Sequence, residues 1–328
     1  MRYAHNGFIN KFQTDIIYTD FSKAFDTVVH SLLIYKLDIM GFPTILLNWI
    51  SSYLEDRTQK VHFNSLLSDD ISVSSGVPQG SHLGPLLFVL YLNDLPSVIR
   101  FSNILMFADD VKLFCSLNTL NSSLNLQHDL HSLVNWCSSN GMTLNLKKCK
   151  KLTLSRTRPI SIDYFIGSHK LDSVDSFTDL GIILDTKLRF HLHIESSVNK
   201  AKSLLGFIKR WSKEFDDPYI TKRLFNSLVR PTLEYGCVLW SPFYKNYSNK
   251  IESVQTQFLL FALRGLPWNP LEALPPYVNR LKLIDLPTLD RRRLMLRAIF
   301  IIKLLRGQID SNFLTGEIKF NAHMHKTY

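Results

Sequence analysis

The chain has 328 residues, 45% of them apolar, and a net charge of +10. This length and apolar fraction suffice for sizeable buried cores and favour two or more structural units. No apolar run reaches the ~20 residues that span a bilayer, and the first residues lack a secretory signal, so we expect an intracellular protein of the nucleus or cytoplasm, away from membranes. Four cysteines without C-x-x-C spacing favour reduced, buried thiols over a disulfide or zinc framework.

Residues 1–190 alternate short apolar runs with stretches of helical spacing. A buried strand is predicted over 15–20, and further strands are predicted over 59–64, 71–73, 104–108, 111–114, 151–155, 162–166 and 181–184. Helices are predicted over 31–37, 43–54, 83–95 and 120–140. Residues 75–80 (SGVPQG) are predicted to form a rigid loop, because proline fixes one φ angle and glycine allows close backbone approach.

From about residue 191 the pattern changes to long amphipathic helices. They are predicted over 194–213, 218–229, 250–263 and 289–305, with a proline-marked irregular connector over 267–276. The predicted fold class is therefore α+β, with an antiparallel sheet and packed helices followed by an α-helical block.

The basic excess lies in this helical block. Residues 196–306 hold 19 Lys and Arg against 8 Asp and Glu, whereas residues 1–195 hold 17 against 18. Such asymmetry indicates a polyanionic partner, above all nucleic acid. The alternative is a set of solvated helix faces without a partner.

Two adjacent acids, Asp109 and Asp110, interrupt an apolar run and are followed by a second one. Run, break and run predict a β-hairpin with the acids at its turn. Adjacent carboxylates repel each other unless a cation is shared between them, so the pair predicts bound metal. An isolated Asp-Asp pair can also do no more than cap a turn.

A third acid, Asp20, ends the strand predicted over 15–20. Strand ends meet across a sheet even when they are far apart in sequence, so we expect Asp20 to lie beside Asp109 and Asp110. Three carboxylates around hard divalent cations suit two-metal phosphoryl transfer.

In their order along the chain, these blocks resemble the reverse transcriptases of non-LTR retrotransposons, particularly the jockey-like mobile elements. The resemblance covers nearly the whole chain from residue 15 onward. The blocks that carry it are 20–26 (DFSKAFD), 75–81 (SGVPQGS) with 84–88 (GPLLF), 107–110 (FADD), 145–150 (NLKKCK), 180–182 (LGI), 225–231 (FNSLVRP), Tyr235-Gly236 and 291–293 (RRR). Cys149 stands where such enzymes usually have threonine.

The resemblance implies a right-hand polymerase fold. Its palm would span 1–190, its helical thumb 191–265 and a C-terminal helical extension 266–328. The implied activity is RNA-directed DNA polymerisation, in which a deoxynucleoside triphosphate is joined to a primer 3′-hydroxyl on an RNA template. Two Mg²⁺ (or Mn²⁺) ions would be held by Asp20, Asp109 and Asp110.

The same resemblance assigns substrate contacts. The Phe21 carbonyl would complete a metal shell, Phe25 would exclude a 2′-hydroxyl, and Lys148 would protonate or neutralise the leaving pyrophosphate. The remaining contacts are Gln79 and Gly80 for the nucleotide and templating pair, and Leu180 and Gly181 for a primer grip. On spacing alone, Phe25 is better explained as a core residue, and a solvated basic turn explains Lys148 nearly as well as a catalytic role does.

The helix predicted over 194–213 carries basic side chains together with Phe207 and Trp211. This composition suits a thumb helix that binds a template–primer duplex through its phosphates, without sequence specificity. The basic residues are Lys200, Lys202, Lys209, Arg210 and Lys213. His191, His193, His323 and His325 have no cysteine partners, so we expect surface histidines rather than zinc ligands.

Members of the family carry a fingers region, and commonly an endonuclease, before the first palm strand, and this chain reaches that strand by residue 15. The resemblance therefore implies an N-terminally truncated polymerase whose fingers and endonuclease segment are missing, with little or no primer extension by the chain alone. The rival hypothesis is an inactive retrotransposon fragment or a repurposed nucleic-acid-binding protein. A viral RNA-dependent RNA polymerase fits less well, because such enzymes typically have glycine where Ala108 stands.

Overall fold

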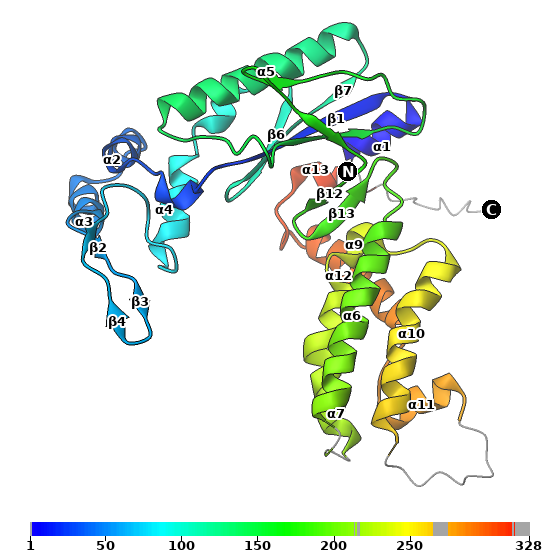
Figure 1. Ribbon diagram of the computed structural model, residues 1–328. Coiled ribbons are helices and arrows are strands. Elements are labelled where there is room, and N and C mark those ends of the chain that lie inside the picture. Colours follow the sequence, from blue (N-terminus) through cyan, green and yellow to red (C-terminus); the bar gives the residue numbers. More distant parts are fainter. Residues whose placement is uncertain (1, 213, 215–216, 265–274, 317, 319–328) are drawn as a thin grey trace, which may run out of the picture. The chain divides into compact units, whose positions relative to one another are not determined.

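A computed structural model describes residues 2–212, 214, 217–264, 275–316 and 318 (Figure 1). The chain forms two compact units. The first consists of Met1–Phe177 with Asp185–Leu188, and the second of Thr178–Leu184 with Arg189–Tyr328. The expected α+β fold class is confirmed, because a five-stranded sheet with helices lies in the first unit and the second is mostly helical.

The sheet of the first unit is built around one buried strand. Its order is β11-β8-β1-β7-β6, and β1 is antiparallel to both β7 and β8. Six of the eight residues of β1 are buried, and Ile17 is fully covered. The strands are β1 (Gln13–Asp20), β6 (Asn103–Phe107), β7 (Asp110–Leu117), β8 (Lys150–Leu154) and β11 (Asp172–Val174). The predicted strand over 15–20 and the predicted acid hairpin are therefore confirmed.

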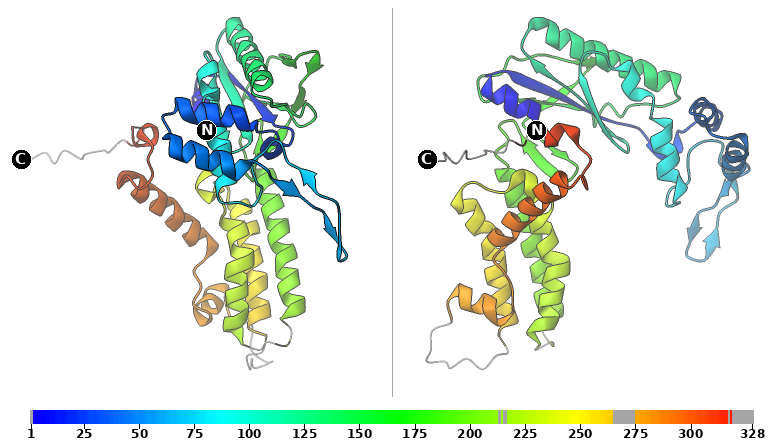
Figure 2. Two further views of the ribbon diagram at one scale, coloured as in Figure 1. Left: turned by 90° about the vertical axis from the view of Figure 1, so that its left-hand side faces the viewer. Right: turned by 180° about the vertical axis from the view of Figure 1, so that it is seen from behind.

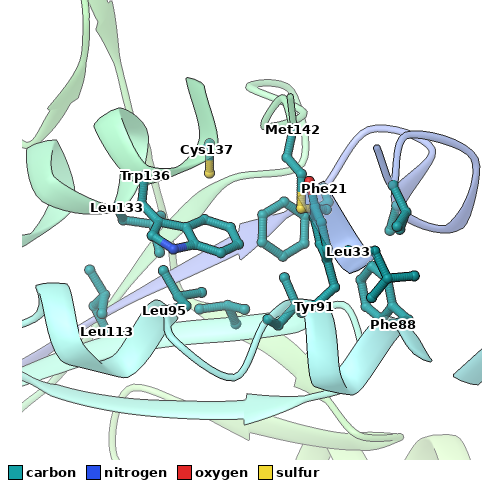
Figure 3. Close-up of a cluster of buried hydrophobic side chains, with 14 of the residues drawn as sticks. Phe21, Leu33, Phe88, Tyr91, Leu95, Leu113, Leu133, Trp136, Cys137 and Met142 are labelled. Atoms are coloured by element: carbon teal, nitrogen blue, oxygen red, sulfur yellow. The ribbon is translucent and has the colours of Figure 1, made fainter. Parts of the chain in front are cut away.

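Helices pack their apolar sides into a common core with this sheet (Figure 3). In helix α5, for example, Leu126, Leu130 and Leu133 recur at helical spacing, so they lie on one side of the helix, and all three are fully buried. These helices are α2 (His30–Ile39), α3 (Thr44–Leu54), α4 (Leu83–Tyr91) and α5 (Leu120–Ser139), with short 3₁₀ turns η1 (Ala24–Asp26) and η2 (Leu95–Val98). Helix α1 (Arg2–Ile9) contacts β1 and β7 outside this core. Helix α1 was not predicted, and the helix expected over 83–95 ends at Tyr91.

The predicted strands over 59–64 and 71–73 form two small ladders. Strand β2 (Thr58–Gln59) pairs with β5 (Ile71–Ser72), whereas β3 (His62–Phe63) pairs with β4 (Leu66–Leu67). Asn64 and Ser65 both have positive φ, which closes a two-residue hairpin and sets this local pairing. The remaining short strands are β9 (Phe165–Ile166), β10 (His169–Lys170), β12 (Ser176–Asp179) and β13 (Ile182–Asp185).

The second unit is a helical bundle in which α6 and α10 lie side by side (Figures 1 and 2). Its helices are α6 (His191–Trp211), α7 (Pro218–Leu224), η3 (Phe225–Val229), α8 (Arg230–Glu234), α9 (Cys237–Trp240), α10 (Lys245–Ala262), α11 (Tyr277–Leu283), α12 (Leu289–Leu305) and α13 (Asn312–Thr315). The helices predicted in this block are confirmed, while most of the predicted connector over 267–276 lies outside the described residues. Among the helices described, none combines the length and apolar character that crossing a membrane requires.

The helix predicted over 218–229 continues to Glu234 through one wide turn. Segment η3 is a π-helix, and the Arg230 amide bonds to the Phe225 carbonyl five residues back. The cause is Pro231, which has no N–H to donate and whose ring would strike the preceding turn of a regular α-helix.

A buried carboxylate, Asp129 on α5, fixes the loop that leads into the acid hairpin. Its oxygens accept hydrogen bonds from the backbone amides of Arg100, Phe101 and Ser102 and from the Ser102 hydroxyl, at 2.6–3.0 Å. Burial alone would raise the pKa of Asp129, but these four hydrogen bonds to the charged form outweigh it and lower the pKa.

We expect Asp129→Asn to destabilise the protein at neutral pH and to flatten its acid sensitivity. Because the pKa is lower in the folded state, the carboxylate stabilises the fold above the unfolded value of ~3.9, and this stability is lost as the pH falls towards the folded value. Urea unfolding from pH 7 to pH 3 measures this effect. The exposed Asp69→Asn is the control, and an equal pH dependence in wild type and Asp129→Asn would contradict the expectation.

Candidate active site at the end of the central strands

The sheet brings the predicted acids to one end of neighbouring strands. In the β1–β7 ladder Asp20, the last residue of β1, lies opposite Asp110, the first residue of β7. Asp109 lies in the two-residue turn between β6 and β7, beside Ala108 with φ of +52°. Three carboxylates from two distant parts of the chain therefore share one sheet end, as the sequence predicted.

The three acids differ in their surroundings. Asp110 is exposed and Asp109 half-buried, whereas the side chain of Asp20 is only 25% exposed. Oδ2 of Asp20 is buried and has no hydrogen-bond partner among the described residues. Its nearest cation is the Lys148 ammonium, whose Nζ lies 3.1 Å away without hydrogen-bond geometry. Oδ2 of Asp20 is thus buried, and its contact with Lys148 is an ion pair without a hydrogen bond.

Lys148 reaches Asp20 because the segment before it pairs with the end of β1. The Ser22 amide donates to the Thr143 carbonyl and the Asn145 amide donates to the Asp20 carbonyl, both at 2.8 Å. A turn then follows, closed by the Lys148 amide donating to the Asn145 carbonyl at 3.0 Å. Next to it Cys149 is 1% exposed, and burial raises the pKa of its thiol. The basic turn is therefore fixed to the acid-bearing strand.

The loop over 75–80 is held against the segment that follows Asp20. The Gly76 amide donates to the Val28 carbonyl and the Val77 amide to the Phe25 carbonyl, both at 2.8 Å. Gln79 Nε2 donates to Asp26 Oδ1 at 3.0 Å, while Gln79 and Gly80 remain exposed. The predicted loop is thus anchored at its buried end and open at 79–80. The Gln79–Asp26 contact was not predicted, since no local signal links residues so far apart.

The two predicted phenylalanines have different environments. Phe21 is 4% exposed and its ring belongs to the core (Figure 3), so its ring is not available to a ligand. Phe25 is half-buried and its ring stacks on Phe88, with centroids 4.7 Å apart and planes at 22°. Phe25 therefore has a core contact on one side and keeps part of its ring accessible.

In the second unit, the predicted basic residues of α6 lie on both edges of its exposed half, one in a row with aromatic residues and two in a basic row. At 100° per residue, Lys200 lines up with Phe207 and Trp211, whereas Lys202 lines up with Lys209 on the opposite edge of the exposed half. Arg210 is exposed between the rows, and the Lys209 ammonium lies 5.9 Å from the centre of the Phe261 ring. Lys213 lies outside the described residues.

The predicted primer-grip residues form the two-residue turn between β12 and β13. Leu180 and Gly181 both have positive φ, +46° and +79°, as type I′ hairpin turns require. The carbonyl of Leu180 accepts a hydrogen bond from the hydroxyl of Tyr235 at 2.9 Å. In the sequence, Tyr235 is only part of a block that resembles the family, and no role was predicted for it.

Within the described residues, no group of three or more His, Cys, Asp or Glu side chains is arranged to hold a metal ion. The donors at the sheet end nevertheless fit a hard divalent cation in kind, since all three are carboxylates. The buried, unbonded Oδ2 of Asp20 is the observation that favours such an ion.

Comparison with known proteins identifies related sequences. The family described as "Reverse transcriptase (RNA-dependent DNA polymerase)" matches residues 8–184. The RNA-directed DNA polymerase from mobile element jockey of Drosophila melanogaster is 27% identical over 263 residues, which are 76% of this chain and 28% of that protein. The probable RNA-directed DNA polymerase from transposon BS of the same fly is 29% identical, over 76% of this chain and 29% of that protein. The chain thus spans a little over a quarter of the length of these relatives.

Solved structures with partial likeness include telomerases. Telomerase from Candida tropicalis, in complex with a fragment of telomeric RNA, aligns with a TM-score of 0.45 and 11% identity, covering 92% of this chain and 44% of that one. The Candida albicans telomerase complex aligns with a TM-score of 0.38 and 14% identity, over 86% of this chain and 50% of that one.

Proposed function

Because the chain belongs to the reverse transcriptase (RNA-dependent DNA polymerase) family, we propose that it is the palm and thumb of an RNA-directed DNA polymerase of a non-LTR retrotransposon. The observation that carries the proposal is the pairing of Asp20 with Asp110 at one sheet end, with Asp109 in the adjoining turn. In this proposal residues 1–190 form the palm, 191–265 the thumb and 266–328 a C-terminal extension.

Asp20, Asp109 and Asp110 would hold two Mg²⁺ (or Mn²⁺) ions, and the Phe21 carbonyl would supply a further oxygen. When bound, the ions lower the pKa of a primer 3′-hydroxyl and offset charge on the leaving pyrophosphate. The buried Oδ2 of Asp20 supports this role, because an ion is a stronger partner for it than the solvent-exposed Lys148 ammonium.

Lys148 would act on the triphosphate. Its ammonium lies 3.1 Å from Asp20 Oδ2 and its side chain is 65% exposed, so it can turn from the carboxylate towards a ligand. There it would neutralise the leaving pyrophosphate or donate a proton to it. The hydrogen bond from the Asn145 amide to the Asp20 carbonyl keeps the basic turn beside the acids in either position.

Phe25, Gln79 and Gly80 would contact the deoxynucleoside triphosphate. The Phe25 ring, which stacks on Phe88, would exclude a 2′-hydroxyl. The exposed end of the 75–80 loop, anchored through Gln79 to Asp26, would contact the templating base pair. Leu180 and Gly181 would contact the primer end.

The partner of the second unit would be an RNA template paired with a DNA primer. Lys200, Lys202, Lys209 and Arg210, with Lys213 beyond the described residues, would contact phosphates. The basic surplus of residues 196–306 supports this proposal. Lys202, Lys209 and the exposed Arg210 beside them are suited to the phosphates of one strand, while Lys200 lies on the other edge of the helix with Phe207 and Trp211.

We expect duplex affinity to fall steeply with salt and each of Lys200→Gln, Lys202→Gln and Arg210→Gln to reduce the slope of log K against log salt by about 0.7–0.9. Fluorescence anisotropy of a labelled RNA–DNA duplex measures the slope. Lys170→Gln, which removes an exposed lysine paired with Asp163 in the first unit, is the matched control. A flat salt response, or an equal effect of Lys170→Gln, would contradict a basic binding face on α6.

Extension of a DNA primer on homopolymer RNA tests the proposed reaction. Template-directed, Mg²⁺-dependent incorporation of deoxynucleotides in preference to ribonucleotides supports it. Salt-dependent duplex binding without any incorporation would instead support the second candidate, a nucleic-acid-binding protein derived from a polymerase, which the basic surplus favours independently of the acids.

A further inference from the structure

The Leu180–Gly181 turn needs support from outside its own hairpin. Left-handed φ is strained for a residue with a Cβ, and Leu180 has φ of +46° although it is 40% exposed and gains little from burial. The turn joins only short strands, β12 and β13, and a two-stranded ribbon is marginally stable by itself.

Tyr235 supplies support from the helical side. Its hydroxyl donates to the Leu180 carbonyl at 2.9 Å, and a Cβ placed on Gly181 would lie 3.3 Å from the Tyr235 ring. The ring therefore lies against the backbone of residue 181 while the hydroxyl holds residue 180. One side chain contacts both residues of the turn.

The bend that presents Tyr235 is itself fixed. Buried Trp240 donates its Nε1 hydrogen to the Tyr235 carbonyl at 2.7 Å, and the Tyr235 amide donates to the Pro231 carbonyl at 2.9 Å. Gly236 has φ of +62°, and a Cβ there would lie 2.6 Å from Cδ1 of Ile182. The 235–236 bend is thus packed directly on the hairpin.

A histidine holds the other side of the hairpin. Nδ1 of His193 accepts a hydrogen bond from the Ile183 amide at 3.3 Å, and its ring lies 5.0 Å from Trp240 at 67°. The expectation of a surface histidine is wrong for His193, which is 5% exposed because it falls on the buried side of α6. His323 and His325 lie outside the described residues.

We propose that Tyr235 is a positioning residue that fixes the Leu180–Gly181 turn to the helical unit, so that the primer end and the bound duplex are held by one body. The proposal rests on the proposed primer contact at 180–181. It agrees with the assignment of Thr178–Leu184 to the helical unit although the flanking residues belong to the other. The α6 rows would hold the duplex, and Tyr235 would set where its primer terminus lies.

The contact of Tyr235 with the Leu180–Gly181 turn is called the clamp below. Amide hydrogen exchange of the full chain tests the clamp without any ligand. Tyr235→Phe keeps the ring but removes the donor to Leu180, so we expect exchange over 181–183 to accelerate about three- to tenfold, with the bundle unchanged. Tyr244→Phe, at another exposed tyrosine of the same unit, is the matched control. Unchanged exchange in Tyr235→Phe, or equal acceleration in Tyr244→Phe, would overturn the clamp.

A primer with 2-aminopurine at its 3′ end tests the primer contact. Binding to wild type should change the emission of this base, and Tyr235→Phe should lose most of that change while duplex affinity by anisotropy stays within about twofold. A variant that retains the full emission change overturns Tyr235 as a positioning residue. If wild type binds the duplex with no emission change, the primer contact proposed for 180–181 fails, and the exchange result still decides the clamp.

Discussion

Replacement of Asp109 by asparagine is expected to abolish divalent-metal binding at the end of the central sheet and to lower any primer extension that the chain supports by about 10³-fold. Asparagine keeps the shape of the turn residue but removes a negative charge and a strong oxygen ligand. Asp109 lies in the turn directly before Asp110, and Asp110 lies opposite Asp20 in the β1–β7 ladder. No further carboxylate of this ladder lies at the same sheet end to replace Asp109.

The measurement of metal binding separates this result from a loss of activity with another cause. Titration calorimetry with Mn²⁺ should show binding in wild type and none in Asp109→Asn. Asp163→Asn makes the same chemical change at an exposed carboxylate paired with Lys170 and should bind as wild type does. Equal Mn²⁺ affinity in wild type and Asp109→Asn would rule out the acids as the metal site.

Gly76→Ala is expected to destabilise the first unit by about 2–5 kcal/mol. Gly76 has φ of +87°, and a Cβ there would lie 2.7 Å from the Asp26 Cα and 2.8 Å from the Phe25 carbonyl oxygen. Left-handed φ costs an alanine about 1–2 kcal/mol, and forced overpacking costs about 1–3 kcal/mol more. Backbone rather than a flexible side chain blocks the space, so the loop has to separate from the 25–28 segment.

Gly80→Ala is the matched control in the same loop. Gly80 has a nearly equal φ of +84°, but a Cβ there would meet nothing within 4 Å. It should therefore lose only the conformational part, about 1–2 kcal/mol. Urea unfolding compares the two variants, and equal losses would show that the close approach of Gly76 to Asp26 does not contribute to stability.

The meeting of Asp20 and Asp110 could be predicted because its signals are local. Each acid borders an apolar run, and antiparallel pairing places the end of one run opposite the start of the other. The long helices α5 and α6 were predictable for a similar reason, since their buried residues recur at helical spacing along many turns.

Contacts between distant segments could not be predicted in this way. The hydrogen bond from Gln79 to Asp26 and the burial of His193 depend on which segments become neighbours. The pairing of β3 with β4 depends on the left-handed conformations of Asn64 and Ser65. The alternation of apolar and polar residues along a strand does not indicate such conformations.

The assignment of Thr178–Leu184 to the helical unit has a consequence for how the protein can be divided. The chain passes between its two units three times, at 177–178, 184–185 and 188–189. A fragment that begins at residue 189 would contain Tyr235 and His193 but not their partners, Leu180 and Ile183. A single cut after Leu188 would leave the hairpin on the N-terminal piece and its partners Tyr235 and His193 on the C-terminal piece. Any excised form of the helical bundle therefore has to start before Thr178.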